Sequence, residues 1–148
     1  MNIMINTQIL GPAAVLIIWS LLMLLWVVVT RFPAFNKAGL DLASADPGAR
    51  YQDVEAALPP SVNWKSHNFT HLMEAPTLFY AVVMILAIAP GEGQYSIAIA
   101  WGYVGARIMH SLWQALVNTV PVRFALYALS TLCLLALAID AVRITVFA

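Results

Sequence analysis

The amino-acid sequence predicts an all-α integral membrane protein with four transmembrane helices in a single domain, residues 1–148. Two observations support this fold class. Of the 148 residues, 62% are hydrophobic and only 9% are charged, whereas about a quarter of the residues in a soluble domain are charged. Four segments are also long enough to cross a bilayer, which needs about 20 apolar residues. These segments lie at about 9–30, 67–89, 95–119 and 122–147.

The charge and cysteine content exclude several classes of protein. The formal net charge is zero, and no basic run indicates a nucleic-acid partner. The single cysteine, Cys133, excludes an internal disulfide framework and a cysteine-rich metal site. Because Cys133 lies in an apolar segment, we expect an inert, buried thiol.

The first apolar segment, 9–30, is interpreted as a retained span. It is too long for the apolar region of a signal peptide, and it lacks a basic start and a small-residue cleavage site. A long polar connection, 31–66, follows it. This connection has room for a short helix around 51–58, and the pattern leaves open whether it is a lid or a solvated connector.

The distribution of Lys and Arg predicts the orientation of the spans. The connection 31–66 contains four of these residues, whereas the N-terminus and the expected tight turn at 89–93 contain none. Because cytoplasmic loops carry an excess of Lys and Arg, we expect the long first loop and the turn at 118–121 to be cytoplasmic. Both termini then lie outside.

The second segment carries polar residues on one helix face. His67, His71 and Glu74 are spaced i, i+4 and i+7, and Asn68 lies at the edge of that face. A carboxylate inside a span needs a cation, a donor or a proton. Arg107, deep in the third segment, is its expected partner. Pro76 removes a backbone hydrogen bond and should kink the helix just beyond Glu74.

The third segment contains a polar stripe inside an apolar helix. At about 100° per residue, its five members fall within roughly 80° of one face. They are Tyr103, Arg107, His110, Gln114 and Asn118. An arginine within a span usually faces the bundle interior, so the stripe indicates a site rather than a surface.

The fourth segment begins with a polar pair. Arg123 and Tyr127 are spaced i, i+4 and share a face, which allows them to share a ligand. Asp140 and Arg143, spaced i, i+3 near the other end, are expected to form an interfacial pair without a chemical role.

Three interpretations of these polar residues remain open. The first is a structural ion pair between Glu74 and Arg107. The second is a metal site at His67, His71 and Glu74, since two histidines four apart plus a carboxylate can chelate a divalent ion. The third is a site for a polar anionic ligand that enters from the cytoplasmic side and meets arginine side chains.

The residues of the third and fourth segments carry a family resemblance. The pattern reads Tyr103-Val-Gly-Ala-Arg107-Ile-Met-His110-Ser-Leu, followed by Pro121-Val-Arg123-Phe-Ala-Leu-Tyr127. It resembles the signature of the MAPEG family, the membrane-associated proteins in eicosanoid and glutathione metabolism. The resemblance also covers the four-span layout, the long first loop and the Asn/His–Glu–Pro part of the second span. It is closest to the small bacterial members, which implies a bacterial inner membrane.

The resemblance implies a left-handed four-helix bundle, assembled as a homotrimer in contact with membrane lipids. Glutathione would bind between subunits as a cosubstrate. By position, Arg107 resembles the family arginine beside the glutathione thiol and is the expected catalytic residue. The expected glutathione-binding residues are Asn68, His71, Glu74, Tyr103, His110, Arg123 and Tyr127. Two features depart from the family pattern, because His71 replaces a common Asn and Pro76 lies closer to the glutamate.

The chemistry implied is activation of a thiol. A free thiol has a pKa of about 8.5, and a nearby guanidinium favours the anion without losing its own proton. The thiolate would then attack a lipophilic electrophile from the bilayer. Two other functions stay open. One is a noncatalytic scaffold or lipid-binding protein of the same fold, and the other is a small transporter that uses Glu74, Arg107 and His110.

Overall fold

Helices make up 83% of the described residues in the computed structural model. The structure describes residues 5–89 and 94–147, and no strand occurs in these two ranges. The helices in chain order are α1 (Leu10–Lys37), η1 (Leu42–Ser44), η2 (Tyr51–Ala57), α2 (Pro60–Glu74), α3 (Pro76–Ile88), α4 (Gln94–Leu116) and α5 (Val120–Val146). The all-helical prediction is confirmed.

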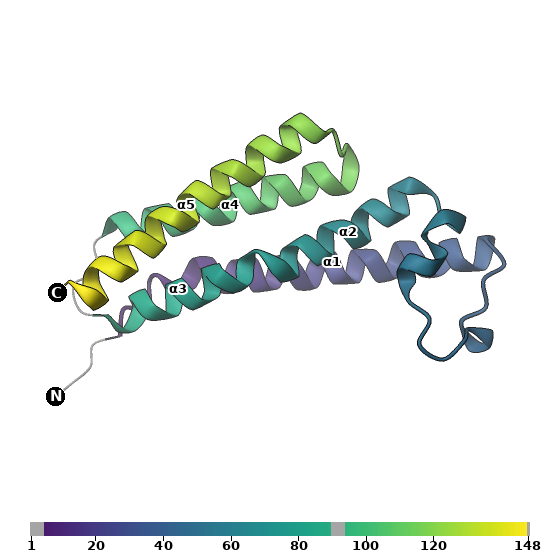
Figure 1. Cartoon of the computed structure of the whole chain (residues 1–148), viewed down its shortest axis with the longest axis horizontal. Helices are drawn as coiled ribbons and strands as arrows, with labels where there is room; N and C mark the ends of the chain where they lie inside the picture. The colour runs from purple at the N-terminus through teal and green to yellow at the C-terminus, as the bar shows by residue number, and fades with distance from the viewer. Residues whose placement is uncertain (1–4, 90–93, 148) are drawn as a thin grey trace.

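The long helices form two antiparallel pairs. Figure 1 shows α1 alongside the continuous rod of α2 and α3, with the α4–α5 hairpin packed beside them. Both termini lie at the end where α3 stops and α4 starts. The segment 38–59 and the α4–α5 turn lie toward the opposite end. The tight turn expected at 89–93 lies almost wholly outside the described residues.

The helix α1 extends beyond the predicted span and ends at Lys37. Gly39 adopts a left-handed φ of 69°, and its N–H donates to the carbonyl of Asn36 at 3.3 Å. The N–H of Leu40 donates to the carbonyl of Phe35 at 3.0 Å. This paired pattern is a Schellman motif, which satisfies the last carbonyls of a helix.

The predicted loop 31–66 is therefore too long, and the connection runs from 38 to 59. Hydropathy marks where a helix leaves the bilayer core, whereas the helix itself stops where its backbone is capped. The helix α2 already begins at Pro60, because proline suits the first turn of a helix. The expected short helix is present as the 3₁₀ helix η2, and Leu58 packs on Ala34 and Phe35 beside it.

Pro76 interrupts the second predicted span. It has no N–H to donate to the carbonyl four residues earlier, and α2 ends at Glu74 while α3 starts at Pro76. Ala75 between them keeps helical angles, φ −66° and ψ −39°. The two helices consequently continue as one rod with a local defect in its backbone hydrogen bonds.

Three of the four predicted spans are long and apolar enough to cross a membrane. They are Leu10–Lys37, Pro60–Ile88 and Val120–Val146. The helix α4 is not among them, because its inward face carries the polar stripe. The outer faces of the other helices expose large apolar residues such as Leu25 and Leu132, 57% and 64% exposed. Such surfaces are typical of helices in contact with lipid.

The hydrophobic core lies between the two helix pairs. Its members that are exposed by 1% or less include Leu16, Leu72, Phe79, Leu86, Tyr103 and Leu137, which come from all five long helices. This core ends toward the α4–α5 turn, where the polar residues of α2 and α4 replace it.

Candidate functional site

The candidate site lies where α2, α4 and α5 meet near the α4–α5 turn. A cavity of about 200 Å³ opens there. Its lining consists of His71, His110, Val120, Arg123, Phe124 and Tyr127. The fold thus brings together four of the predicted site residues from three helices. All side chains of this lining are basic, aromatic or aliphatic, so the cavity suits an anionic or apolar group.

Arg107 adjoins this cavity from inside the bundle and is only 1% exposed. Its Nη2 donates to the backbone carbonyl of His71 at 2.8 Å. Its Nε and Nη1 are buried without a hydrogen-bond partner among the described residues. A buried cationic group with open donors is costly unless something satisfies it. The guanidinium is therefore equipped to receive an acceptor or an anion.

Aromatic and imidazole rings surround the guanidinium. The Cζ of Arg107 lies 5.6 Å from the centroid of the Tyr127 ring. The His110 ring lies 6.2 Å from the His71 ring and 6.0 Å from the Tyr127 ring, centroid to centroid. These rings separate Arg107 from water, which strengthens its electrostatic effect on any neighbouring group.

Arg123 provides the positive charge in the cavity wall. Its Nη1 donates to Oδ1 of Asn118 at 2.6 Å. Asn118 was expected to be the last member of the helical stripe, but α4 ends at Leu116 and Asn118 lies in the turn with φ 59°. Asparagine tolerates this left-handed conformation. The turn therefore holds the arginine of the next helix in place.

The predicted ion pair between Glu74 and Arg107 is wrong. The Glu74 side chain is 66% exposed, and its Oε2 lies 3.9 Å from Nδ1 of His71. Arg107 instead bonds a backbone carbonyl. The reason is tertiary, because the rotation of α2 against α4 turns the Glu74 side chain outward and presents the His71 carbonyl to Arg107. Glu74 lies beside the cavity but outside its lining.

Tyr103 occupies the inner end of the polar stripe. It is 1% exposed, and its ring stacks on Phe79 with centroids 4.2 Å apart and planes at 17°. Its hydroxyl has no hydrogen-bond partner among the described residues. Tyr103 thus faces the bundle interior, as the stripe predicts, but it does not line the cavity.

Asn68 points away from the cavity and into the bundle. It is 1% exposed, and its Nδ2 donates to Oγ of Ser111 at 2.8 Å. The same oxygen accepts a hydrogen bond from Nε1 of Trp19 at 3.0 Å. The sequence pattern did not single out Ser111. Its only signal was its place beside His110, one turn beyond Arg107.

The polar stripe itself is confirmed along the helical part of its length. Tyr103, Arg107, His110 and Gln114 are each exposed by 3% or less. The Oε1 atom of Gln114 has no partner among the described residues. Periodicity therefore identified the inward face of α4 correctly.

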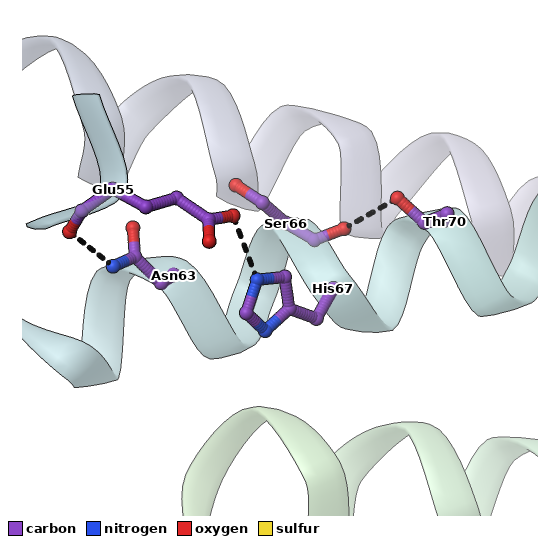
Figure 2. Close-up of polar contacts among 5 residues, drawn as sticks. All are labelled: Glu55, Asn63, Ser66, His67 and Thr70. Atoms are coloured by element: carbon purple, nitrogen blue, oxygen red, sulfur yellow. Dashed lines mark hydrogen bonds and ion pairs between the residues drawn. The ribbon is translucent and has the colours of Figure 1, made fainter. Parts of the chain in front are cut away.

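The loop segment η2 is held against α2 by a second polar cluster (Figure 2). The backbone carbonyl of Glu55 accepts a hydrogen bond from Nδ2 of Asn63 at 2.8 Å. The Glu55 carboxylate meets Nε2 of His67 at 2.8 Å. His67 lies one turn before His71, so the loop reaches the neighbourhood of the cavity.

The arrangement does not fit the metal-site interpretation. Within residues 5–89 and 94–147, no three His, Cys, Asp or Glu side chains group so as to hold an ion. His67 is engaged with Glu55, and Glu74 lies at the surface. The cationic residues beside the cavity also oppose a bound cation.

The model of the MAPEG family matches residues 9–143 of the chain. No curated protein and no solved structure matches it. The match covers α1 to α4 and most of α5, including the helices that build the cavity.

Proposed function

Because the chain belongs to the MAPEG family, we propose that it is a membrane-bound, glutathione-dependent transferase or peroxidase. Membership of this family indicates a role in glutathione or eicosanoid metabolism. Glutathione would bind as a cosubstrate, and its thiolate would attack a lipophilic electrophile.

The main support for the proposal is the burial of Arg107 together with its open hydrogen-bond donors. Its guanidinium is buried beside a cavity, and two of its nitrogens have no partner in the described structure. A thiol with an ordinary pKa of about 8.5 is mostly protonated at neutral pH. A poorly solvated cation nearby lowers this pKa, because it favours the anionic form. Arg107 therefore acts as the thiol-activating residue.

The residues of the cavity lining are suited to bind a peptide that carries carboxylates. Glutathione carries two carboxylates and one amine, so Arg123 suits one carboxylate through charge-assisted hydrogen bonds. His71, His110 and Tyr127 supply further polar groups in the wall. Glu74, exposed beside His71, suits the amine. Tyr103 and Asn68 act from behind the cavity through packing.

The outer edge of the cavity supports entry of the electrophile from the bilayer. Phe124 and Val120 line the cavity and are 70% and 63% exposed. Apolar side chains at this edge favour a lipophilic substrate over a soluble one. The site would thus join a water-soluble thiol to a membrane-soluble acceptor.

We propose a homotrimer of left-handed four-helix bundles as the functional assembly. The single-chain cavity measures about 200 Å³, whereas ligand sites usually enclose roughly 300–1,000 Å³. A neighbouring copy would supply the missing wall. The helix α4 would serve as the fourth span, since its polar face is buried and α5 runs antiparallel to it.

We also propose an orientation of the chain in the membrane, based on the distribution of Lys and Arg. Arg31, Lys37, Arg50 and Lys65 lie on or beside the segment 38–59. The K/R bias then puts this segment and the α4–α5 turn in the cytoplasm, with both termini outside. In a bacterial inner membrane, the cavity would open toward cytoplasmic glutathione.

A second candidate is a noncatalytic lipid-binding protein. An almost wholly apolar groove of about 470 Å³ lies between α3 and α5, with Leu78, Val82, Leu134 and Val142 in its lining. A lipid chain would fit this surface without any thiol chemistry.

The deciding experiment is ultraviolet difference absorbance of the detergent-purified protein titrated with glutathione at neutral pH. We expect a saturable thiolate signal that disappears in Arg107→Gln. The matched control is Arg143→Gln, because Arg143 is exposed and lies at the opposite end of α5. Retention of the signal in folded Arg107→Gln contradicts the role of Arg107, and its absence from the wild-type protein favours the lipid-binding candidate.

A further inference from the structure

Three helices meet at a single oxygen atom of Ser111. This residue of α4 is 0% exposed. Its Oγ accepts hydrogen bonds from Nε1 of Trp19 on α1 and from Nδ2 of Asn68 on α2, at 3.0 and 2.8 Å. Both lone pairs of the hydroxyl are thereby used.

Ser111 acts together with Arg107 in joining α2 to α4. Asn68 bonds Ser111, and the carbonyl of His71 accepts from Nη2 of Arg107 at 2.8 Å. The partners are three residues apart on α2 and four apart on α4, so the two bonds lie one helical turn apart. Two bonds at this spacing fix both the sliding and the rotation of α2 against α4.

The position of the His71 carbonyl decides how Arg107 is oriented. The Nη2 of Arg107 makes one hydrogen bond, to this carbonyl, and its Nε and Nη1 make none among the described residues. If α2 slid or turned, the carbonyl would leave Nη2, and the planar guanidinium would rotate as a unit. Its charge and its open donors would then point elsewhere.

We propose that Ser111 is a positioning residue of the thiol-activating site, which it serves by locking the register between α2 and α4. The inference rests on the proposed function. Ser111 does not touch the ligand but acts through Asn68 and His71 on Arg107. It therefore controls the strength of thiol activation rather than the binding of glutathione.

Ser130 is buried like Ser111 but lacks its bonds between helices. Ser130 is 1% exposed, but its Oγ donates to the carbonyl of Tyr127 in its own helix, at 2.8 Å. Such a bond joins no two helices. Ser130→Ala is therefore a matched control for burial and size.

The test measures the thiol pKa of bound glutathione from the pH dependence of its thiolate absorbance. In Ser111→Ala, we expect this pKa to rise by about one unit, which is a tenfold loss of thiolate at a fixed pH well below it. The Kd for glutathione should change by less than about threefold, because no binding group is removed. Ser130→Ala should keep the wild-type pKa.

Two further variants test the same proposal if Ser111→Ala does not fold. Asn68→Ala breaks the α2–α4 bond and should raise the thiol pKa as Ser111→Ala does. Trp19→Phe removes only the bond to α1 and should raise it less. An unchanged thiol pKa in folded Ser111→Ala or Asn68→Ala overturns the inference.

A second measurement separates this inference from the proposed function. Arginine modification by phenylglyoxal, located by mass spectrometry, reports the protection of Arg107 without any thiol. We expect slow modification of Arg107 in wild type and Ser130→Ala, and faster modification in Ser111→Ala. If the wild-type protein shows no thiolate, the proposed function fails while this readout still decides the role of Ser111. Equal rates in all three proteins overturn that role.

Discussion

The α4–α5 hairpin has a cavity at each end, and the two differ in how their charges are satisfied. The cavity near the termini is the larger, about 420 Å³, and Ser96, Asp140 and Arg143 are among its lining. There Ser96 donates to Asp140 at 2.5 Å, and Arg143 lies 4.0 Å from the other carboxylate oxygen. The smaller cavity, near the turn, holds Arg123 and adjoins Arg107 without any carboxylate in its lining.

Because of this difference, the proposed site is placed at the smaller cavity by its unsatisfied charge and not by its volume. At the larger cavity the predicted interfacial pair, Asp140 and Arg143, is present and neutralises itself. At the smaller one the Nε and Nη1 donors of Arg107 remain open within the described structure. A ligand gains most where it completes buried groups that have no other partner.

Removing the guanidinium of Arg107 should have the largest effect. We expect Arg107→Gln to lower kcat/KM with glutathione and a lipophilic electrophile about 100-fold or more, as the loss of a preorganised charge does. Arg143→Gln, at the other cavity, should leave it within about twofold, since an exposed ion pair contributes little. Equal losses in both variants would remove the distinction between the two ends.

Arg123 should matter next, through binding. Arg123→Gln loses a charge-assisted contact and should raise the Kd for glutathione roughly tenfold, equivalent to about 1.4 kcal/mol. Added salt should weaken glutathione binding to the wild-type protein more than binding to the variant. Calorimetric titration in detergent measures both quantities. A Kd that stays at the wild-type value would exclude Arg123 from the ligand contacts.

A substitution at the larger cavity should lower the stability of the protein and leave its activity unchanged. Ser96 is 2% exposed and supplies the hydrogen bond to the Asp140 carboxylate. Ser96→Ala should therefore destabilise the protein by about 1–2 kcal/mol, seen as a lower Tm, with kcat/KM unchanged. A loss of activity at an unchanged Tm would show that this end has a chemical role.

The smallest expected effect concerns the loop near the smaller cavity. Glu55→Gln removes the charge that meets His67, so the segment 38–59 should open more often and trypsin should cleave after Arg50 roughly threefold faster. Asp46→Asn, an exposed change in the same loop, is the control. Equal cleavage rates would mean that the Asn63 bond and the Leu58 packing hold the loop without this pair.

Much of the fold was predictable from the sequence, because its signals are local. The apolar segments, the proline at Pro76 and the helical period of the Tyr103–Gln114 stripe depend on neighbouring residues alone. The structure confirms the helices and the burial of the stripe, and it divides the second span into α2 and α3 at Pro76, where a kink was predicted. The start of the loop was misplaced because the Schellman motif at Gly39, and not hydropathy, stops α1, and its end was misplaced because α2 already begins at Pro60.

The site was less predictable, because its contacts depend on how one helix is rotated against another. A helical wheel put Glu74 on the same face as His71, yet the packed α2 turns the carboxylate outward and presents a backbone carbonyl to Arg107. The bonds from Trp19 and Asn68 to Ser111 span 92 and 43 residues of sequence. No spacing rule relates residues that far apart.

Composition and short-range periodicity encode the membrane class, the order of the helices, the inward face of α4 and the family, so these properties can be predicted from the amino-acid sequence. Which polar groups are satisfied and which are left open depends instead on how the helices pack. Hydrogen bonding between helices depends on distances of a few ångströms across the interface, and side-chain packing sets these distances after the helices have formed. The open donors of Arg107 are a product of that packing.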